Sequence, residues 1–214
     1  MLVIAIDGPA GAGKSTVGRA LASRLGLSYL DTGAMYRAMT FAVQQRGIAE
    51  GDLADVAAIA PDVAIDVDPE LGRVLVDGLD ATRQIRSREV TDAVSQIAAN
   101  PAVRRELVER QRAWVAARGG GVVEGRDIGS VVFPDAALKL FVTASPRVRA
   151  ERRVAEIGGD VTDVEASIIE RDRKDSTRAA SPLTELDDAV TVDTTGMTIV
   201  EVVEHILALL KERV

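Results

Sequence analysis

Hydrophobic residues follow two different spacings along the chain. Short continuous runs, typical of strands buried on both faces, predict strands at residues 2–6, 27–31, 121–125, 137–144 and 189–195. Recurrence every three or four positions predicts amphipathic helices at about 14–25, 33–45, 88–99, 101–118 and 199–210. Strands that alternate with helices in this way favour an α/β protein with a parallel sheet.

Two segments interrupt this alternation. Within residues 61–85, VAIDVD and GRVLVDG alternate hydrophobic with polar residues around a Glu-Leu-Gly turn, which predicts an antiparallel β insertion. Residues 146–178 are helical in pattern, rich in Arg and Glu, and divided by Gly158-Gly159, which suits a short helical lid. Because no repeat or linker sets these segments apart, we expect a single domain over residues 1–214.

Composition narrows the class of protein. The 214 residues include 47% hydrophobic but only 3% aromatic residues, so the core must consist of Ala, Val, Leu and Ile. A net charge of −7 argues against a general nucleic-acid binder, and the absence of Cys removes disulfides and thiolate metal sites. No apolar run is long enough to span a bilayer, and the first strand does not resemble a signal peptide. We therefore expect a soluble cytoplasmic protein.

A glycine-rich stretch, GPAGAGKST, separates the first predicted strand from the first helix. Gly8, Gly13, Lys14 and Ser15 match the G-x-x-x-x-G-K-[ST] motif in the context it requires. Glycine allows successive backbone N–H groups to turn inward, and the helix N-terminus adds positive potential for phosphate. Lys14 is expected to reach the β- and γ-phosphates, and the Ser15 hydroxyl to bind Mg²⁺. The predicted triphosphate-binding residues are Gly8, Pro9, Ala10, Gly11, Ala12, Gly13, Lys14, Ser15 and Thr16.

Other features restrict what the bound phosphate can do. GTPases need an Asn-Lys-x-Asp motif to read guanine, but the only Asn is Asn100, which precedes Pro101. Residues 193–196, DTTG, match the D-x-x-G of GTPases, but their place near the C-terminus makes chance the better explanation. Motor and transporter ATPases need partner domains that this length cannot hold. A small-molecule kinase is the favoured class.

Residues 31–37, DTGAMYR, follow the second predicted strand. Thr32, Tyr36 and Arg37 are suited to bind a second phosphate at the carboxyl edge of the sheet. The alternative is an N-capped helix whose Tyr36 and Arg37 only face solvent.

Residues 124–129, EGRDIG, follow another central strand. Arg126 could offer a planar fork to phosphate, and Asp127 could accept a hydrogen bond from an amino group. A local ion pair between them is the alternative. Glu124 could contact Mg²⁺ through water, and a structural role is equally compatible with its position.

The charged run at residues 170–178, ERDRKDSTR, places three side chains on one helical face. Arg171, Asp175 and Arg178 are spaced at i, i+4 and i+7. Such a run is often a salt-bridged, solvated helix. It would also serve as a mobile lid that brings arginines to a transferring phosphoryl group.

With these stretches in this order, the chain resembles the bacterial cytidylate kinases, a family of nucleoside monophosphate kinases. The resemblance covers nearly the whole length and rests on GPAGAGKST, LDTGAMYR, Ser95-Gln96 with Pro101-x-Val103-Arg104, GRDIGSVVFPD and ERDRKDSTRAASPL. It implies a three-layer P-loop NTPase fold with a central parallel sheet, an antiparallel β insertion and a short helical lid. It further implies a core of about 1–31, 119–145 and 188–214, a monophosphate-binding region of about 32–118, and a lid of about 146–178.

The resemblance also implies roles for individual residues. Thr32, Arg37, Arg126 and Arg178 would hold the acceptor monophosphate, with Tyr36 lining its pocket. Cytosine presents one amino donor and two acceptors, which a carboxylate and Arg or Ser donors complement. The residues implied to read it are Ser95, Arg104 and Asp127, while Arg171 and Asp175 would contact the sugar, and Arg152 is a candidate for the ATP phosphates. One departure is Thr32, where relatives have Ser, and it keeps the hydroxyl.

The implied reaction transfers the γ-phosphoryl group of ATP to CMP or dCMP with Mg²⁺. Lys14, Arg126 and Arg178 would neutralise charge on the transferring group. We expect only nucleotides as partners, with no nucleic acid and no membrane, and a monomer. Two alternatives remain: a kinase for another acceptor such as AMP, UMP or shikimate, and a nucleotide-switched regulatory protein. The missing guanine motif and the second-site arginines argue against the switch.

Overall fold

The computed structural model describes residues 1–68, 71–177 and 181–213. The chain forms two compact units, one from Met1–Tyr29 with Arg118–Val214 and the other from Leu30–Ala117. It passes from the first unit to the second within strand β2 (Tyr29–Asp31). None of the helices in the described ranges combines the length and apolarity needed to cross a membrane.

The first unit contains a five-stranded sheet in the order β2-β6-β1-β7-β8. Its other strands are β1 (Leu2–Asp7), β6 (Gly120–Glu124), β7 (Leu138–Thr143) and β8 (Val190–Asp193). Strand β1 pairs in parallel with β6 and β7, and β7 pairs in parallel with β8. Because the carboxyl ends of parallel strands lie at the same edge of a sheet, the residues that follow β1 and β6 lie close together at that edge. The five predicted strands and their parallel arrangement are confirmed.

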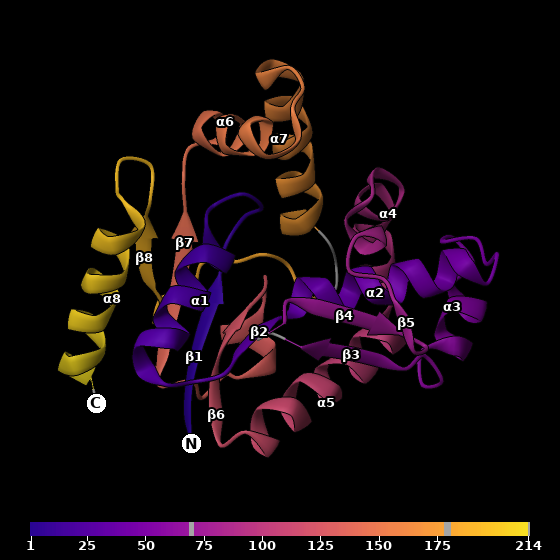
Figure 1. Ribbon diagram of the computed structural model, residues 1–214, viewed down its shortest axis with the longest axis horizontal. Helices are drawn as coiled ribbons and strands as arrows, with labels where there is room; N and C mark the ends of the chain where they lie inside the picture. Colours follow the sequence, from indigo (N-terminus) through magenta and orange to yellow (C-terminus); the bar gives the residue numbers. More distant parts are fainter. Residues whose placement is uncertain (69–70, 178–180, 214) are drawn as a thin grey trace. The chain divides into compact units, whose positions relative to one another are not determined.

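Four longer helices belong to this unit: α1 (Lys14–Leu25), α6 (Pro146–Ile157), α7 (Val161–Thr177) and α8 (Ile199–Arg213). Helices α1 and α8 lie beside the strands of the sheet (Figure 1). Leu21 of α1 and Ile206 of α8 belong to one hydrophobic core with Ile4 and Leu138 of the strands. Helices α6 and α7 lie beyond the end of β7 and pack against each other (Figure 1). The predicted break at Gly158-Gly159 is confirmed, since α6 ends at Ile157 and its C-cap, Gly158, has a φ of 76°.

The second unit is mainly helical. Its helices are α2 (Thr32–Gln45), α3 (Leu53–Ile59), η1 (Gln84–Arg86), α4 (Arg88–Ala99) and α5 (Pro101–Ala117). The predicted β insertion is confirmed as an antiparallel sheet of β3 (Ile65–Asp68), β4 (Arg73–Val76) and β5 (Leu79–Asp80). Strand β5 adds a pairing beyond the two predicted strands. Asp77-Gly78, with φ of 50° and 81°, turns the chain between β4 and β5.

A short π-helix, η2 (Ile128–Val132), follows β6 and was not anticipated, because its hydrophobic residues show no helical spacing over so short a length. It begins where the carbonyl of Asp127 accepts hydrogen bonds from the N–H groups of Val131 and Val132. Arg178 and Glu70, which belong to the predicted lid and the predicted turn, lie outside the described residues.

Candidate active site

The phosphate loop connects β1 to α1 through three glycines with positive φ. They are Gly8 (139°), Gly11 (75°) and Gly13 (88°). A Cβ at Gly8 would lie 2.0 Å from the carbonyl oxygen of Val142, so only glycine fits there. Helix α1 begins at Lys14, directly after the loop, so its first N–H groups, which have no helical partners, are available to phosphate.

Lys14 and Ser15 lie at the start of α1. The buried Lys14 reaches back across the loop, where its Nζ donates to the carbonyls of Gly8 at 2.9 Å and Pro9 at 2.8 Å. The Ser15 hydroxyl donates to Oε1 of the buried Glu124 at 2.7 Å. The structure thus joins the predicted Mg²⁺ ligand to the acid at the end of β6, and both supply the oxygen atoms that Mg²⁺ prefers.

Helix α6 and the loop after β8 brace the phosphate loop. Arg152 donates to the hydroxyl and carbonyl of Thr194 at 3.1 and 2.8 Å, and the Thr194 hydroxyl bonds the carbonyl of Ala12 at 3.1 Å. The buried Arg149 donates to the carbonyl of Ala10 at 3.0 Å and pairs with Asp172 of α7 at 2.7 Å. The predicted ATP ligand Arg152 is therefore linked through Thr194 to Ala12 of the phosphate loop.

Four of the predicted acceptor residues lie after the end of β6 (Arg126 and Asp127) or on α7 (Arg171 and Asp175). Arg126 pairs with Asp175 at 2.9 Å and donates to the carbonyl of Gly8 at 2.7 Å. Asp127 and Asp175 are both buried. The ion pair of Arg126 therefore joins it to α7, and the structure brings Arg126 and Asp175 together with the phosphate loop.

The charged run on α7 has an exposed side and a buried side. Arg173 pairs with Glu170 on the exposed face at 2.7 Å, as a solvated helix would. Asp175 is buried, and Arg171 is half-buried. The predicted sugar-contacting residues Arg171 and Asp175 are thus less exposed than the Glu170–Arg173 pair.

The second unit holds five further predicted acceptor residues: Thr32, Tyr36, Arg37, Ser95 and Arg104. Asp31 caps α2 by accepting from the N–H of Ala34 at 2.9 Å, and Thr32 begins the helix. The guanidinium of the buried Arg104 lies 5.7 Å from the ring centre of Tyr36, a cation–π distance. Tyr36 is buried and Arg37 half-buried, so the alternative of a helix that simply presents both to solvent is wrong. Ser95 is half-buried on α4.

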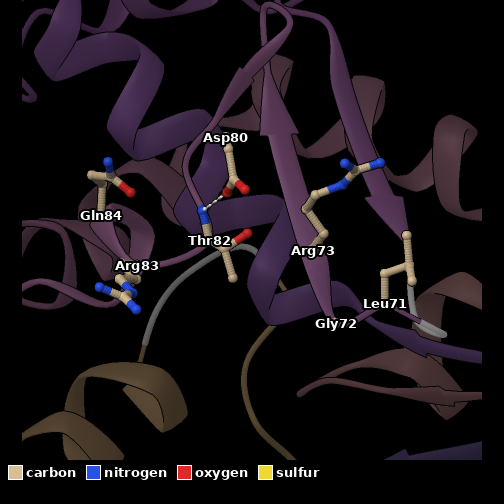
Figure 2. A pocket seen from close by; sticks show the side chains of 7 residues that line it. All are labelled: Leu71, Gly72, Arg73, Asp80, Thr82, Arg83 and Gln84. Carbon is tan, nitrogen blue, oxygen red and sulfur yellow. Dashed lines mark hydrogen bonds between the residues drawn. The ribbon is translucent and has the colours of Figure 1, made fainter.

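A separate cavity of about 460 Å³ lies beside β4 and β5 in the second unit. Figure 2 shows its lining, in which the Asp80 carboxylate accepts from the N–H of Thr82 at 3.0 Å. None of the predicted nucleotide-binding residues lines it; the lining residues are Leu71, Gly72, Arg73, Asp80, Thr82, Arg83 and Gln84.

Asp7 is a buried acid of the site whose pKa is raised, and it was not among the predicted site residues. It ends β1 and is buried, and its carboxylate accepts from the N–H groups of Ile128 at 2.8 Å and Gly129 at 2.7 Å. Burial raises the pKa of Asp7 to about 6, against the lowering effect of the two N–H donors; nearby Asp127 raises it and Lys14 lowers it. The motif does not require an acid here, so only its place at a strand's carboxyl end could have suggested a role.

The raised pKa of Asp7 predicts how stability varies with pH. The folded protein binds this proton more tightly than the unfolded chain, whose pKa is 3.8, so the contribution is full below about pH 4 and is lost as the pH rises through about 6. Between about pH 4.5 and pH 7.5 we expect wild type to lose about 2 kcal/mol relative to Asp7→Asn. Urea unfolding of both proteins across this range measures the difference. A difference that does not change with pH would contradict the assigned pKa.

Comparison with known proteins decides the family. The model of the cytidylate kinase family matches residues 4–212. The chain belongs to the cytidylate kinase family. It is 51% identical over 218 residues to a cytidylate kinase from Mycobacterium leprae, covering 99% of this chain and 96% of that protein. A cytidylate kinase from Streptomyces avermitilis is 47% identical over 216 residues, with 99% and 94% covered. The resemblance inferred from the motifs is thereby confirmed.

Solved structures show similarity in fold. A gluconokinase from Sinorhizobium meliloti matches with a TM-score of 0.53 at 18% identity, covering 99% of this chain and 92% of that one. The predicted kinase-type α/β fold is confirmed by this match together with the parallel sheet and its flanking helices.

Proposed function

We propose that the protein transfers the γ-phosphoryl group of ATP to CMP or dCMP, giving ADP and CDP or dCDP, with Mg²⁺ bound to the phosphates. Its membership of the cytidylate kinase family makes it a phosphotransferase. The observation that carries the proposal is a complete phosphate loop whose Gly8 carbonyl is bonded by both Lys14 and Arg126. One backbone group thus links the donor-binding lysine to an arginine proposed to bind the acceptor.

The donor side of the reaction is assigned to the phosphate loop. Residues 8–16 would surround the ATP phosphates, and Lys14 would neutralise charge on the β- and γ-phosphates. Arg152, fixed by Thr194, would add a second positive charge at the edge of the loop. Mg²⁺ would be held by Ser15 and by phosphate oxygens, with Glu124 binding one of its waters, since Mg²⁺ commonly keeps several waters. Bound there, the ion neutralises phosphate charge during transfer.

The acceptor side is assigned by residue chemistry. Thr32, Arg37 and Arg126 would bind the monophosphate, and Tyr36 would line its pocket. Asp127 would accept from the cytosine amino group, while Ser95 and Arg104 would donate to its ring acceptors. Arg171 and Asp175 would contact the sugar, and Arg178 would add charge to the transferring group.

The chemistry needs no general base, because the attacking oxygen of the acceptor monophosphate is already anionic. Catalysis then depends on in-line positioning and on neutralisation of the transferring group. Exclusion of water at this step would keep ATP from being hydrolysed. Monomeric state and a cytoplasmic location stay predictions.

The proposed acceptor is tested by ADP release measured with CMP, dCMP, UMP, AMP and shikimate. We expect CMP and dCMP to give the highest kcat/KM, and the rate without acceptor to be at least about a hundredfold lower. Equal rates with and without every acceptor would contradict the kinase assignment and support a nucleotide-switched protein. A higher kcat/KM with AMP or shikimate than with CMP would contradict the assignment of Ser95, Arg104 and Asp127 to cytosine recognition.

The proposed Mg²⁺ site predicts an effect at Glu124. Glu124→Gln keeps the size of the side chain but removes its charge, so the Mg²⁺ concentration for half-maximal rate should rise by about tenfold. The comparison is made at saturating ATP and CMP over a titration of Mg²⁺. An unchanged Mg²⁺ requirement would mean that Glu124 has only a structural role.

A further inference from the structure

We propose that Asp7 is a positioning residue for the acceptor, because its carboxylate fixes the Arg126–Asp127 segment in the conformation that binds CMP. This inference rests on the proposed function, which places Arg126 and Asp127 among the acceptor-binding residues. Asp7 itself would not touch either nucleotide, because both of its oxygens accept from backbone N–H groups.

The segment is anchored to β1 on both sides. Before it, the N–H of Gly125 donates to the carbonyl of Ile6 at 2.9 Å. After it, the N–H groups of Ile128 and Gly129 donate to Asp7 at 2.8 and 2.7 Å. Arg126 and Asp127 are the two residues between these anchors. The conformation of the segment is therefore set by β1, and Asp7 supplies the only side-chain contact among these anchors.

The side chain of Arg126 is tied to the residue next to Asp7. Its Nη1 donates to the carbonyl of Gly8 at 2.7 Å, and Lys14 donates to the same carbonyl at 2.9 Å. The Asp7-Gly8 dipeptide thus holds both the backbone and the side chain of the acceptor segment where the phosphate loop begins. A displacement of the segment would move Arg126 relative to Lys14.

Close packing leaves the segment little room to adjust. A Cβ at Gly129 would lie 3.1 Å from Cδ of Lys139 and 3.4 Å from Oδ2 of Asp7. Asp7 is buried, and so are Asp127 and Ile128. Because the region is closely packed, the loss of one of these hydrogen bonds should displace Asp127.

The anchor requires the ionised carboxylate. Two N–H donors need two acceptor oxygens, whereas a protonated carboxyl group has one donor and one acceptor, which is also what Asn offers. The charged groups that face Asp7 are Asp127 before η2 and Lys14 of α1. Glu124 ends the neighbouring strand β6, and Lys139 on β7 pairs its ammonium with Asp188 at 2.6 Å. Asp7→Asn therefore imitates the protonated state.

The first test compares KM for CMP between wild type and Asp7→Asn as a function of pH. Taking the ratio of the two values cancels the ionisation of CMP's own phosphate, which affects both proteins equally. We expect KM for CMP of Asp7→Asn to exceed that of wild type by about tenfold near pH 8, and the two values to become nearly equal near pH 5. KM for ATP should differ between the two proteins by less than about twofold. Asp135→Asn, which alters an exposed acid just after η2, serves as the matched control and should give a ratio of one throughout.

The second test does not depend on turnover. In ¹⁵N-labelled protein without nucleotide, the amide shifts of Ile128 and Gly129 should titrate with a midpoint near pH 6 in wild type and not in Asp7→Asn. A KM ratio that is independent of pH, or a ratio of one near pH 8, would overturn the inference, as would amides that do not titrate. If CMP stimulates the wild type and only the Asp7 results fail, the proposed function stands without the inference. If no acceptor stimulates the wild type, the proposed function itself fails.

Discussion

Replacement of Lys14 by alanine is expected to lower kcat by about a thousandfold. Lys14 is buried at the start of α1, and its ammonium lies across the phosphate loop on the carbonyls of Gly8 and Pro9. From there it would bind the phosphate oxygens on which charge develops during transfer. A buried cation in this position stabilises that charge far more than an exposed one, because water screens it little. The measurement is kcat with saturating ATP and CMP.

The fold should tolerate this change. Loss of the two hydrogen bonds to loop carbonyls should lower the melting temperature by only a few degrees, as expected for about 1–2 kcal/mol in a domain of this size. Lys174→Ala is the matched control, since that lysine is exposed on α7 and pairs at 3.9 Å with Glu170. It should keep wild-type kcat. Retention of turnover in Lys14→Ala would remove Lys14 from its proposed role.

Replacement of Asp127 by asparagine is expected to raise KM for CMP by about thirtyfold and to leave KM for ATP nearly unchanged. Asn has nearly the same size, but it replaces one carboxylate oxygen with an amino donor. If the Asn amide N–H group faces the cytosine amino group, two hydrogen-bond donors oppose each other and the hydrogen bond is lost. Loss of a hydrogen bond to a charged acceptor costs about 2 kcal/mol. Because Asp127 is buried, water cannot easily compensate.

The effect at Asp127 should depend on the base of the acceptor. UMP has a carbonyl where CMP has its amino group, so Asp127→Asn should raise kcat/KM for UMP relative to CMP. Asp135→Asn again provides a control on an exposed aspartate close in sequence. Equal increases in KM for CMP and ATP would indicate a general disturbance of the site and would contradict base reading by Asp127.

The parts of the site that could be predicted from the sequence depend on local order. The phosphate loop is one continuous stretch in which glycine spacing, Lys14 and the start of α1 all follow within a few residues. Likewise, the alternation in the β insertion predicted β3 and β4, whereas β5 has only two residues and is too short for any period to be recognised.

The parts that could not be predicted depend on partners distant in sequence. Asp7 bonds a residue 121 positions away, Arg149 one 139 positions away, and Thr194 one 182 positions away. Arg149 stands among several arginines of similar spacing on α6, and nothing local distinguishes it as the buried one. The π-helix η2 also depends on a distant partner, because its first two N–H groups, of Ile128 and Gly129, donate to the carboxylate of Asp7.

The most direct measurement follows the γ-phosphoryl group of ATP itself. ATP labelled with ³²P at the γ position is incubated with Mg²⁺, the protein and CMP, and the products are separated. If the phosphoryl group is handed to a nucleotide, the label should appear in CDP, with one CDP formed for each ADP. Label in inorganic phosphate, with CMP recovered unchanged, would contradict the assignment as a cytidylate kinase.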